Sequence, residues 1–522
     1  MVVKPLKRSM LLALRLLLPA FLALPFGLRA EDIWVSQGGD TGTNSLAWLN
    51  TPGNWVAGAG KVSPGDTVHL VGTFSNVLNV AGSGSAGSPV TILFEPGAKF
   101  SASLWPASGA INITAKNWIV IDGGSNGLIE NTNNGTSLGN QAQSIGVLSA
   151  QSSHLTIQNL TITNMYRRTL ISDWNRYGGA IDITDGSFIL VRNCHLSEAE
   201  TLLSYTYNSG SYSDVMFDAN TILRGNHTIN IGTAQVNAFL SNLTISSNRI
   251  DHLDTWDSVL YLGSPLHLDG MILFNEAKVG GTNVDSGCMS NVVIYANSVG
   301  PFIGKNNTAA IFFDVYYIDT FVGVKIYNNL FLTTNSWQNG FVNLHCTSAL
   351  VANNTFIGYS QPNPADGGAG AALKVGTGIH VYNNMFDLTG TEINLASSDT
   401  NGFDCDYNLY NRFYNGGTGA FVKTDGTQLG VNDWFPYIYP KDTHSTWPYP
   451  FRTVLDANYM PRAGIGNGVG AGMNLTSYGI TNDFNGNPRP ATGQWTIGAF
   501  ETSSSSSSMS PPNVHSPVKF TP

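Results

Sequence analysis

The sequence predicts an all-β solenoid of the parallel β-helix type, followed by a loop-rich cap. Two observations predict it. Short segments in which every second residue is apolar recur along the chain, and each is followed by an asparagine. With that asparagine as the marker, neighbouring copies are 24 to 49 residues apart, which is the repeat length of solenoid proteins.

The clearest copies are Val324 to Phe331, Leu350 to Phe356 and Ile379 to Phe386. Alternation with a period of two indicates a strand, not a helix. Asparagine suits the corner that follows because it tolerates left-handed backbone angles, and stacked asparagines can bond from coil to coil. No coil buries its apolar face alone, so coils should stack ~4.8 Å apart. The marker residues are Asn220, Asn248, Asn297, Asn329, Asn354, Asn384 and Asn408.

Composition agrees with one long β-rich body. The 522 residues are 42% hydrophobic and only 11% charged, and 57 of them are glycine. The charged share is about half of the usual ~25%. This excludes a disordered chain and allows a solenoid to use most of the length.

The first thirty residues resemble a secretory signal peptide. Basic residues precede an apolar stretch over residues 11–26, and Ala30 precedes Glu31. A membrane anchor is the alternative, but Arg15 and Pro25 interrupt the ~20 apolar residues that an anchor needs. We therefore expect a secreted or periplasmic protein without a membrane span.

The charge and the cysteine content limit which molecules and metals the protein can bind. Without the five basic residues of the leader, 20 basic residues face 34 acidic ones, a net charge of -14. Such a surface repels nucleic acid and anionic lipid. The four cysteines form no Cys-x-x-Cys pair, which argues against zinc and favours buried thiols, although a bridge between coils stays open. They are Cys194, Cys288, Cys346 and Cys405.

The expected domain order is a leader (1–30), the β-helix (31–430), a capping segment (431–501) and a disordered serine-rich tail (502–522). The longest repeat step contains residues 275–287, which we expect to leave the solenoid as a loop.

Both ends of the mature chain resemble a known class of proteins. The opening combines a strand over residues 33–36 with the Pro-Gly-Asp-Thr-Val segment 64–68, and the closing segment combines residues 483–490 with the Ile-Gly-Ala-Phe-Glu segment 497–501. Together with the coils, they resemble the secreted bacterial right-handed parallel β-helix proteins of the pectate-lyase-like class. The resemblance implies a single-stranded right-handed β-helix from about residue 33 to 501.

One set of strands carries the candidate site. The strand after each corner contributes polar residues that stacking should bring side by side on one face. In chain order they are Asp182, His267 with Asp269, Asp314, His345 and Lys374. Two carboxyl groups ~6.5 to 9.5 Å apart can cleave a glycosidic bond with inversion, so Asp269 and Asp314 are the expected acid and base. Nearby aromatic rings such as Trp256 and Tyr316 could stack on sugars.

The order of these residues also resembles the catalytic face of the polygalacturonase-type glycoside hydrolases. There, an Asp-Gly motif, an Asp pair, a histidine and a basic residue come from successive coils. The resemblance implies catalytic roles for Asp269, Asp314 and His345, and substrate binding by His267 and Lys374. The chain departs from that pattern at Phe313, which stands where the family has a second aspartate.

Three functions remain open. The preferred one is hydrolysis of an extracellular polysaccharide. The second is a polysaccharide lyase acting on a uronic-acid polymer, which needs a base and a cation, with calcium as a candidate cofactor. The third is a non-catalytic polysaccharide-binding or surface protein. The sequence does not distinguish oligomeric states.

Overall fold

The computed structural model describes residues 30–502, apart from 134–143, 166–177, 254–267, 303–306, 316, 318–319, 334–339, 359–372, 388, 396–401, 412–419, 448–454, 456–458, 460 and 462–467. The expected signal peptide and nearly all of the serine-rich tail therefore lie outside the described residues. The side chains of Asn307 and Lys374 also lie outside them.

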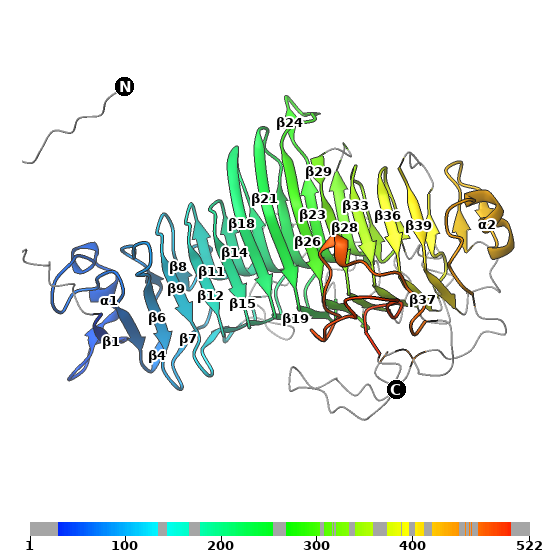
Figure 1. The fold of residues 1–522 in the computed structure, drawn as a ribbon. Coiled ribbons are helices and arrows are strands. Elements are labelled where there is room, and N and C mark those ends of the chain that lie inside the picture. The colour runs from blue at the N-terminus through cyan, green and yellow to red at the C-terminus, as the bar shows by residue number, and fades with distance from the viewer. Residues whose placement is uncertain are drawn as a thin grey trace, which may run out of the picture.

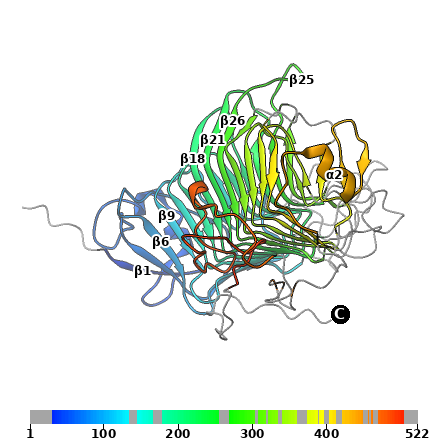
Figure 2. The same ribbon diagram turned by 45° about the vertical axis from the view of Figure 1, so that its right-hand side comes forward.

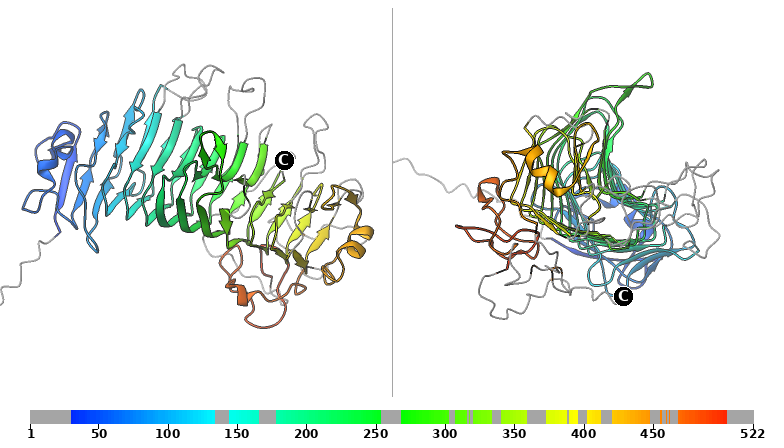
Figure 3. Two further views of the ribbon diagram at one scale, coloured as in Figure 1. Left: turned by 90° about the horizontal axis from the view of Figure 1, so that it is seen from above. Right: turned by 90° about the vertical axis from the view of Figure 1, so that its right-hand side faces the viewer.

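The protein is a parallel β-helix, as the sequence predicts. Three long sheets, named A, B and C here, contain 15, 12 and 13 strands, and nearly every pair of neighbours in them is parallel. The chain visits the sheets in the order A, B, C and then enters the next coil, so the coils stack into the elongated body of Figure 1. Figure 3 (right) looks along this stack.

The strands of each sheet follow the chain order. Sheet A contains β1 (Asp32–Ser36), β2 (Asn44–Ser45), β3 (Thr67–Leu70), β6 (Val90–Phe94), β9 (Ile119–Asp122), β12 (Leu155–Gln158), β15 (Ile189–Arg192), β18 (Gly210–Asp218), β21 (Ala238–Ser246), β26 (Cys288–Tyr295), β29 (Phe321–Val322), β30 (Val324–Tyr327), β33 (Ala349–Ala352), β36 (Ile379–Tyr382) and β39 (Asp404–Asp406). Sheet B contains β4 (Thr73–Phe74), β7 (Lys99–Ala102), β10 (Leu128–Asn131), β13 (Thr161–Thr163), β16 (His195–Ser197), β19 (Thr221–Leu223), β22 (Arg249–Asp251), β27 (Ser298–Val299), β31 (Leu330–Leu332), β34 (Thr355–Ile357), β37 (Met385–Asp387) and β40 (Leu409–Asn411). Sheet C contains β5 (Leu78–Asn79), β8 (Ile111–Asn112), β11 (Ser144–Ala150), β14 (Gly178–Thr184), β17 (Thr201–Thr206), β20 (His227–Thr233), β23 (Leu268–Asn275), β28 (Asn307–Val315), β32 (Val342–Asn343), β35 (Leu373–Lys374), β38 (Ile393–Asn394), β41 (Phe421–Val422) and β42 (Gln428–Leu429).

The corner between sheets A and B is two residues long from β12 onward. Its first residue has a left-handed backbone, for example Asn328 with φ 55°. From β18 onward its second residue is the predicted marker asparagine, and these side chains form a buried ladder. Each Nδ2 donates to the Oδ1 of the next asparagine over 3.0 to 3.2 Å, from Asn220 to Asn408. The ladder fixes the corner in every coil because it satisfies polar groups that burial would leave unpaired.

Apolar side chains of the three sheets fill the interior of the coils. In sheet B they stack directly, with ring centroids 5.0 Å apart between Phe331 and Phe356 and again between Phe356 and Phe386. All three rings are fully buried. Each coil thus supplies one layer of a continuous core, which explains why a single coil could not fold alone.

Short helices lie at both ends of the stack. α1 (Leu46–Leu49) and the 3₁₀ turn η1 (Pro52–Asn54) cover the first coils, and α2 (Val431–Ile438) covers the last ones. Beside α2, the fully buried carboxylate of Asp442 accepts hydrogen bonds from Tyr410 Oη at 2.9 Å, from Trp434 Nε1 at 2.8 Å and from the hydroxyl of Ser445. This cluster holds the cap on the final coil.

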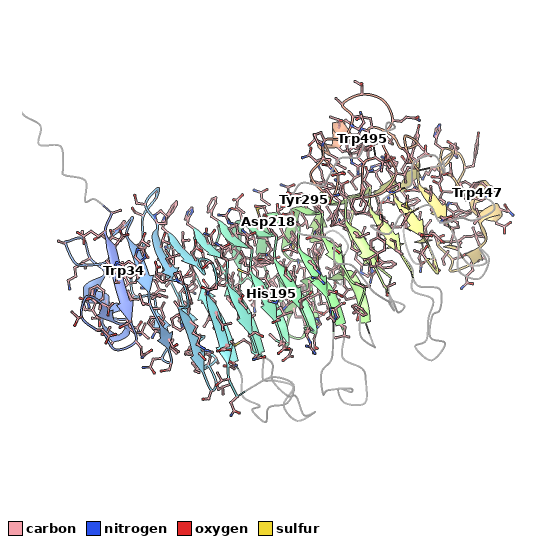
Figure 4. All side chains as sticks on the ribbon, turned by 90° about the horizontal axis from the view of Figure 1, so that it is seen from below. Trp34, His195, Asp218, Tyr295, Trp447 and Trp495 are labelled. Atoms are coloured by element: carbon pink, nitrogen blue, oxygen red, sulfur yellow. The ribbon has the colours of Figure 1, made fainter. Side chains whose placement is uncertain are left out.

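The last described segment, residues 468–502 with the 3₁₀ turn η6 (Thr476–Tyr478), turns back along the solenoid (Figures 1 and 2). It packs on the outer side of sheets A and B, where Trp495 is buried against Leu350 and Tyr382; Figure 4 shows Trp495 in this segment. The first residues of three corners hold it, since Asn328, Asn353 and Asn383 donate to its carbonyl oxygens.

The expected loop at residues 275–287 contains a two-stranded hairpin. β24 (Lys278–Val279) pairs antiparallel with β25 (Thr282–Asn283). The hairpin extends a ridge that the long strands β18 and β21 form above the body (Figure 1).

All four cysteines are free thiols, so no bridge joins coils. Cys194, Cys346 and Cys405 are buried and Cys288 is half-buried. Burial raises the pKa of Cys194 to about 12. Among the described residues, no helix is long and apolar enough to cross a membrane.

Candidate functional site on sheet C

The strands that the sequence singles out are neighbours in sheet C. One outward-facing row runs through them without a break, because each residue pairs with the next across one coil. The row is Asn79, Asn112, Leu148, Asp182, Ser204, Asn230, Ile272, Phe312, Asn343, Lys374, Asn394 and Val422. Most of its members are polar, so this face is not a buried one.

The middle of the face holds an aromatic patch. Phe274 lies two residues beyond Ile272, on the same outward side of β23. A Cβ at Gly232, its partner on the neighbouring strand, would lie 2.6 Å from two atoms of its ring. The same Cβ would lie 2.1 Å from the carbonyl oxygen of Phe274, so a glycine at this position leaves room for both the strand and the ring of the neighbouring coil. Phe274, Phe312 and Ile272 are half-buried, so part of each stays open to solvent. A flat apolar surface of this kind is suited to a sugar ring.

Amides border the patch. Asn230 pairs with Ile272 and Asn343 pairs with Phe312. Asn343 is only 3% exposed, and within the described residues its Oδ1 has no hydrogen-bond partner. A buried amide oxygen without a partner is costly, at ~1 to 3 kcal/mol.

Asp314 lies in β28, and His345 follows the end of β32, the next strand of sheet C. Asp314 is half-buried on the outward side of β28 and pairs with Phe274. His345 is half-buried and lies two residues beyond Asn343, the partner of Phe312. Continuing that register puts His345 opposite Asp314, on the same face.

Asp182 lies on the same outward face, four coils before Phe312 in the row. It is half-buried. Desolvation raises its pKa to about 6, so this carboxyl group changes charge close to neutral pH. Four coils correspond to ~19 Å, so Asp182 lies well away from the aromatic patch.

Asp269 is not on this face, which corrects the expected pairing with Asp314. Its side chain is on the same side of β23 as Met271 and Leu273, and all three are 0% exposed. Asp269 pairs with Ala309, and Asp314 lies five residues further along β28, ~16 Å at 3.3 Å per residue. The two carboxyl groups cannot act as an inverting pair ~6.5 to 9.5 Å apart.

Asp269 instead meets a histidine that the sequence analysis missed. His227 pairs with it across one coil, and Nδ1 of His227 lies 3.3 Å from Oδ2 of Asp269. This is an ion-pair distance, and within the described residues neither oxygen of Asp269 has another partner. The sequence did offer one sign of His227, because this residue directly precedes Thr228 to Ile231, a segment with the same apolar alternation as the other strands of this set.

Several predicted site residues lie outside the described part of the chain. They are His267, Trp256 and Tyr316. For Lys374 the backbone is described, and it lies in the outward row between Asn343 and Asn394. Phe313, which stands where the polygalacturonase-type pattern has a second aspartate, points inward and packs edge-on against Phe321.

The structure also allows a test of the metal expectation. Calcium takes six to eight oxygen ligands. Within the described residues, no three histidine, cysteine, aspartate or glutamate side chains gather into a cluster that could hold a metal ion. The described part of the chain therefore does not fit such a site, and no step is derived through a metal.

Comparison with known proteins gives structural matches only. No protein-family model matches the chain, and no curated protein does. A crystal structure of pectate lyase Pel9A matches with a TM-score of 0.46 and 12% identity, over 91% of this chain and 98% of that one. The alginate lyase AlyGC matches with a TM-score of 0.43 and 11% identity, over 86% of this chain and 57% of that one. The Streptococcus pneumoniae surface protein and adhesin PfbA matches with a TM-score of 0.35 and 13% identity, over 67% of this chain and 89% of that one.

Proposed function

We propose that this protein is a polysaccharide-cleaving enzyme that binds its substrate along the outward face of sheet C. The observation that carries the proposal is the patch in which the ring of Phe274 packs against Gly232 near Asn343, whose buried Oδ1 has no partner among the described residues. An aromatic surface next to a free hydrogen-bonding group matches a sugar, which has an apolar ring face and a rim of hydroxyls.

The length of the face favours a polymer. The outward row repeats at each coil, every ~4.8 Å, and polar side chains continue from Asn79 to Asn394. A repetitive ligand can meet equivalent groups on several coils at once, and each added contact raises the affinity through a high effective concentration.

Elimination fits the described residues better than hydrolysis. Inverting hydrolysis needs two carboxyl groups at a set separation, and Asp269 and Asp314 do not provide it. Elimination needs one base, which takes the proton beside a uronate carboxylate. The positive charge that such a carboxylate requires would come from Lys374, whose backbone lies in the outward row. We therefore propose a lyase acting on a uronic-acid polymer.

The same proposal places the protein outside the cytoplasm. The first thirty residues have the pattern of an export signal, and polysaccharides of this kind are met outside the cell membrane.

The test is a substrate panel. The chain from Glu31 onward is incubated with neutral and uronic polysaccharides while new reducing ends and the absorbance of unsaturated sugars are followed. Both signals together on a uronic polymer support elimination. Reducing ends without absorbance would mean hydrolysis, and binding without either signal would mean a non-catalytic polysaccharide-binding protein.

A further inference from the structure

The starts of two neighbouring sheet C strands bring a histidine and a carboxylate together. His227 is the first residue of β20, and Asp269 is the second residue of β23. Asp269 is fully buried, whereas the side chain of His227 is 32% exposed. The histidine can therefore meet a substrate, while the carboxylate can act only through it. His227 lies three residues before Asn230, ~10 Å along the strand, and an odd offset turns its side chain to the other side of the strand. A ligand would therefore reach its exposed part at the start of β20.

Asp269 differs from the other buried carboxylates in its hydrogen bonds. Asp442 is equally buried and accepts three side-chain hydrogen bonds. Asp251 is also 0% exposed, and its Oδ1 accepts from the backbone N–H groups of His252 and Phe302. Within the described residues, the contact with His227 is the one polar contact of the Asp269 carboxylate. Asp251 and Asp442 are held by hydrogen bonds from the fold, whereas Asp269 depends on the histidine.

A second unsatisfied group lies beside the pair. Asn226 precedes His227, its carbonyl oxygen accepts from the backbone N–H of Asp269 at 3.0 Å, and its side-chain Oδ1 is buried without a partner. Unsatisfied polar groups of this kind are rare in native interiors, and their concentration on two adjacent coils points to a site that acts on a ligand.

The surroundings also set the charge of the histidine. Burial alone would lower the pKa of His227, but the contact with Asp269 and the negative charges of Glu200 and Asp314 outweigh it and raise the pKa above 6.5. The imidazole therefore keeps its proton to a higher pH than a free histidine does, and it can act as a general base where it is neutral. These carboxylates are the charged groups that act on it, and all of them act in the same direction.

We infer that His227 and Asp269 form the proton-transfer pair of the reaction on sheet C. This inference rests on the proposed function. Neutral His227 takes the proton from the carbon beside the uronate carboxylate, and the electron pair of that C–H bond becomes a carbon–carbon double bond as the bond to the neighbouring sugar oxygen breaks. The leaving oxygen then takes the proton from the imidazolium, which restores neutral His227. Asp269 is the positioning residue, which orients the ring and stabilises its charged form.

The experiment compares this pair with a matched one. His252 also faces a fully buried carboxylate, since its Nδ1 lies 3.2 Å from Oδ2 of Asp251, but that carboxylate is hydrogen-bonded. The variants are His227→Ala, His227→Gln, Asp269→Asn and the control His252→Ala, each checked by circular dichroism. We expect both His227 variants to lower kcat at least ~100-fold, the usual contribution of a general base, and His252→Ala to leave kcat near the wild-type value.

The pH profile separates a catalytic pair from a structural one. Because the neutral imidazole is the active form, wild-type kcat/KM should rise with pH through a midpoint above 6.5. Asp269→Asn removes a negative charge that raises the pKa of His227, so the midpoint should move to lower pH and kcat should fall while KM changes little. The midpoint of the wild-type profile can be measured even if a variant does not fold, so the role of His227 can still be tested.

The outcomes distinguish the two proposals. A wild-type protein that cleaves a uronic polymer, with folded His227 variants that keep its kcat or a flat wild-type pH profile, overturns the proton-transfer pair and leaves the proposed function intact. A wild-type protein that cleaves no polymer overturns both.

Discussion

The guanidinium of Arg489 donates a hydrogen bond to the side-chain oxygen of Asn328 over 2.9 Å, across 161 residues of sequence. The same group also donates to the carbonyl oxygens of Gly498 and Thr496 and contacts Glu501 at 3.0 Å. One buried side chain therefore organises the closing segment and fastens it to a corner of the solenoid.

Replacing Arg489 should release this segment. Arg489→Leu leaves several buried carbonyl oxygens and Glu501 without a partner, each at a cost of ~1 to 3 kcal/mol. We expect limited proteolysis to remove residues 468–502 from the variant at a protease concentration that leaves the wild type whole. Arg224→Leu, whose side chain is 48% exposed, should keep the wild-type pattern. An intact segment in Arg489→Leu would contradict this role.

The asparagine ladder should contribute strongly to stability at every rung. Asn354 Nδ2 donates to Asn384 Oδ1 at 3.0 Å and to the carbonyl oxygen of Ile326 at 2.9 Å. Asn354→Ala removes these two bonds and also takes away the oxygen to which the backbone N–H and Nδ2 of Asn329 donate, so we expect a loss of about 3 kcal/mol, measured by denaturant unfolding. Asn432→Ala, at an exposed position of α2, is the control and should change stability little.

Glu392 should make the fold less stable as pH rises. It is fully buried, and desolvation raises its pKa from 4.5 to about 8. A hydrogen bond from Thr389 lowers the pKa but does not outweigh the desolvation. The folded state therefore holds a proton that the unfolded chain releases above pH ~4.5, and stability falls until pH ~8. Glu392→Gln removes this effect, so its stability relative to wild type should rise by up to about 4 kcal/mol between pH 5 and 8.

The measurement for Glu392 is denaturant unfolding of both proteins at several pH values. Glu276→Gln, at a half-buried position on another coil, serves as the comparison. A difference between Glu392→Gln and wild type that stays constant with pH would show that the carboxyl group is not held neutral.

The aromatic patch should contribute to substrate binding. Phe274→Ala removes the ring that lies on Gly232, and the loss of one stacking contact, ~1 kcal/mol, should weaken polymer binding about fivefold. Phe239→Ala is a matched control, because that phenylalanine is 44% exposed on the outer side of sheet A. Binding is measured by affinity electrophoresis in gels that contain the polymer. Equal mobility shifts in the two variants would count against the patch.

The scaffold could be predicted from the sequence because its signals are local. Alternating apolar residues define each strand, and the second corner residue is an asparagine from Asn220 to Asn408. The ladder was predicted from these residues and is confirmed by the hydrogen bonds between them. The role of Arg489 could not be predicted, because its contact with Asn328 depends on how the last segment folds back over the coils.

The candidate site was only partly predicted because register decides which face a residue occupies. Asp269 and Asp314 are 45 residues apart, whereas their two strands pair with an offset of 40. The difference of five is odd, so one side chain points outward and the other inward. Polar character alone suggested the same face for both. His227 was missed for the same reason, because its contact with Asp269 can be recognised only once Asp269 is known to face inward.

The two kinds of corner differ in how much change they tolerate. From β12 onward the connection between sheets A and B is always two residues, whereas the connection between sheets B and C ranges from three residues before β17 to sixteen before β23. Insertions at the first corner would break the asparagine ladder, but insertions at the second leave it untouched. Natural selection can therefore rebuild one rim of the molecule for a new ligand while the scaffold stays the same.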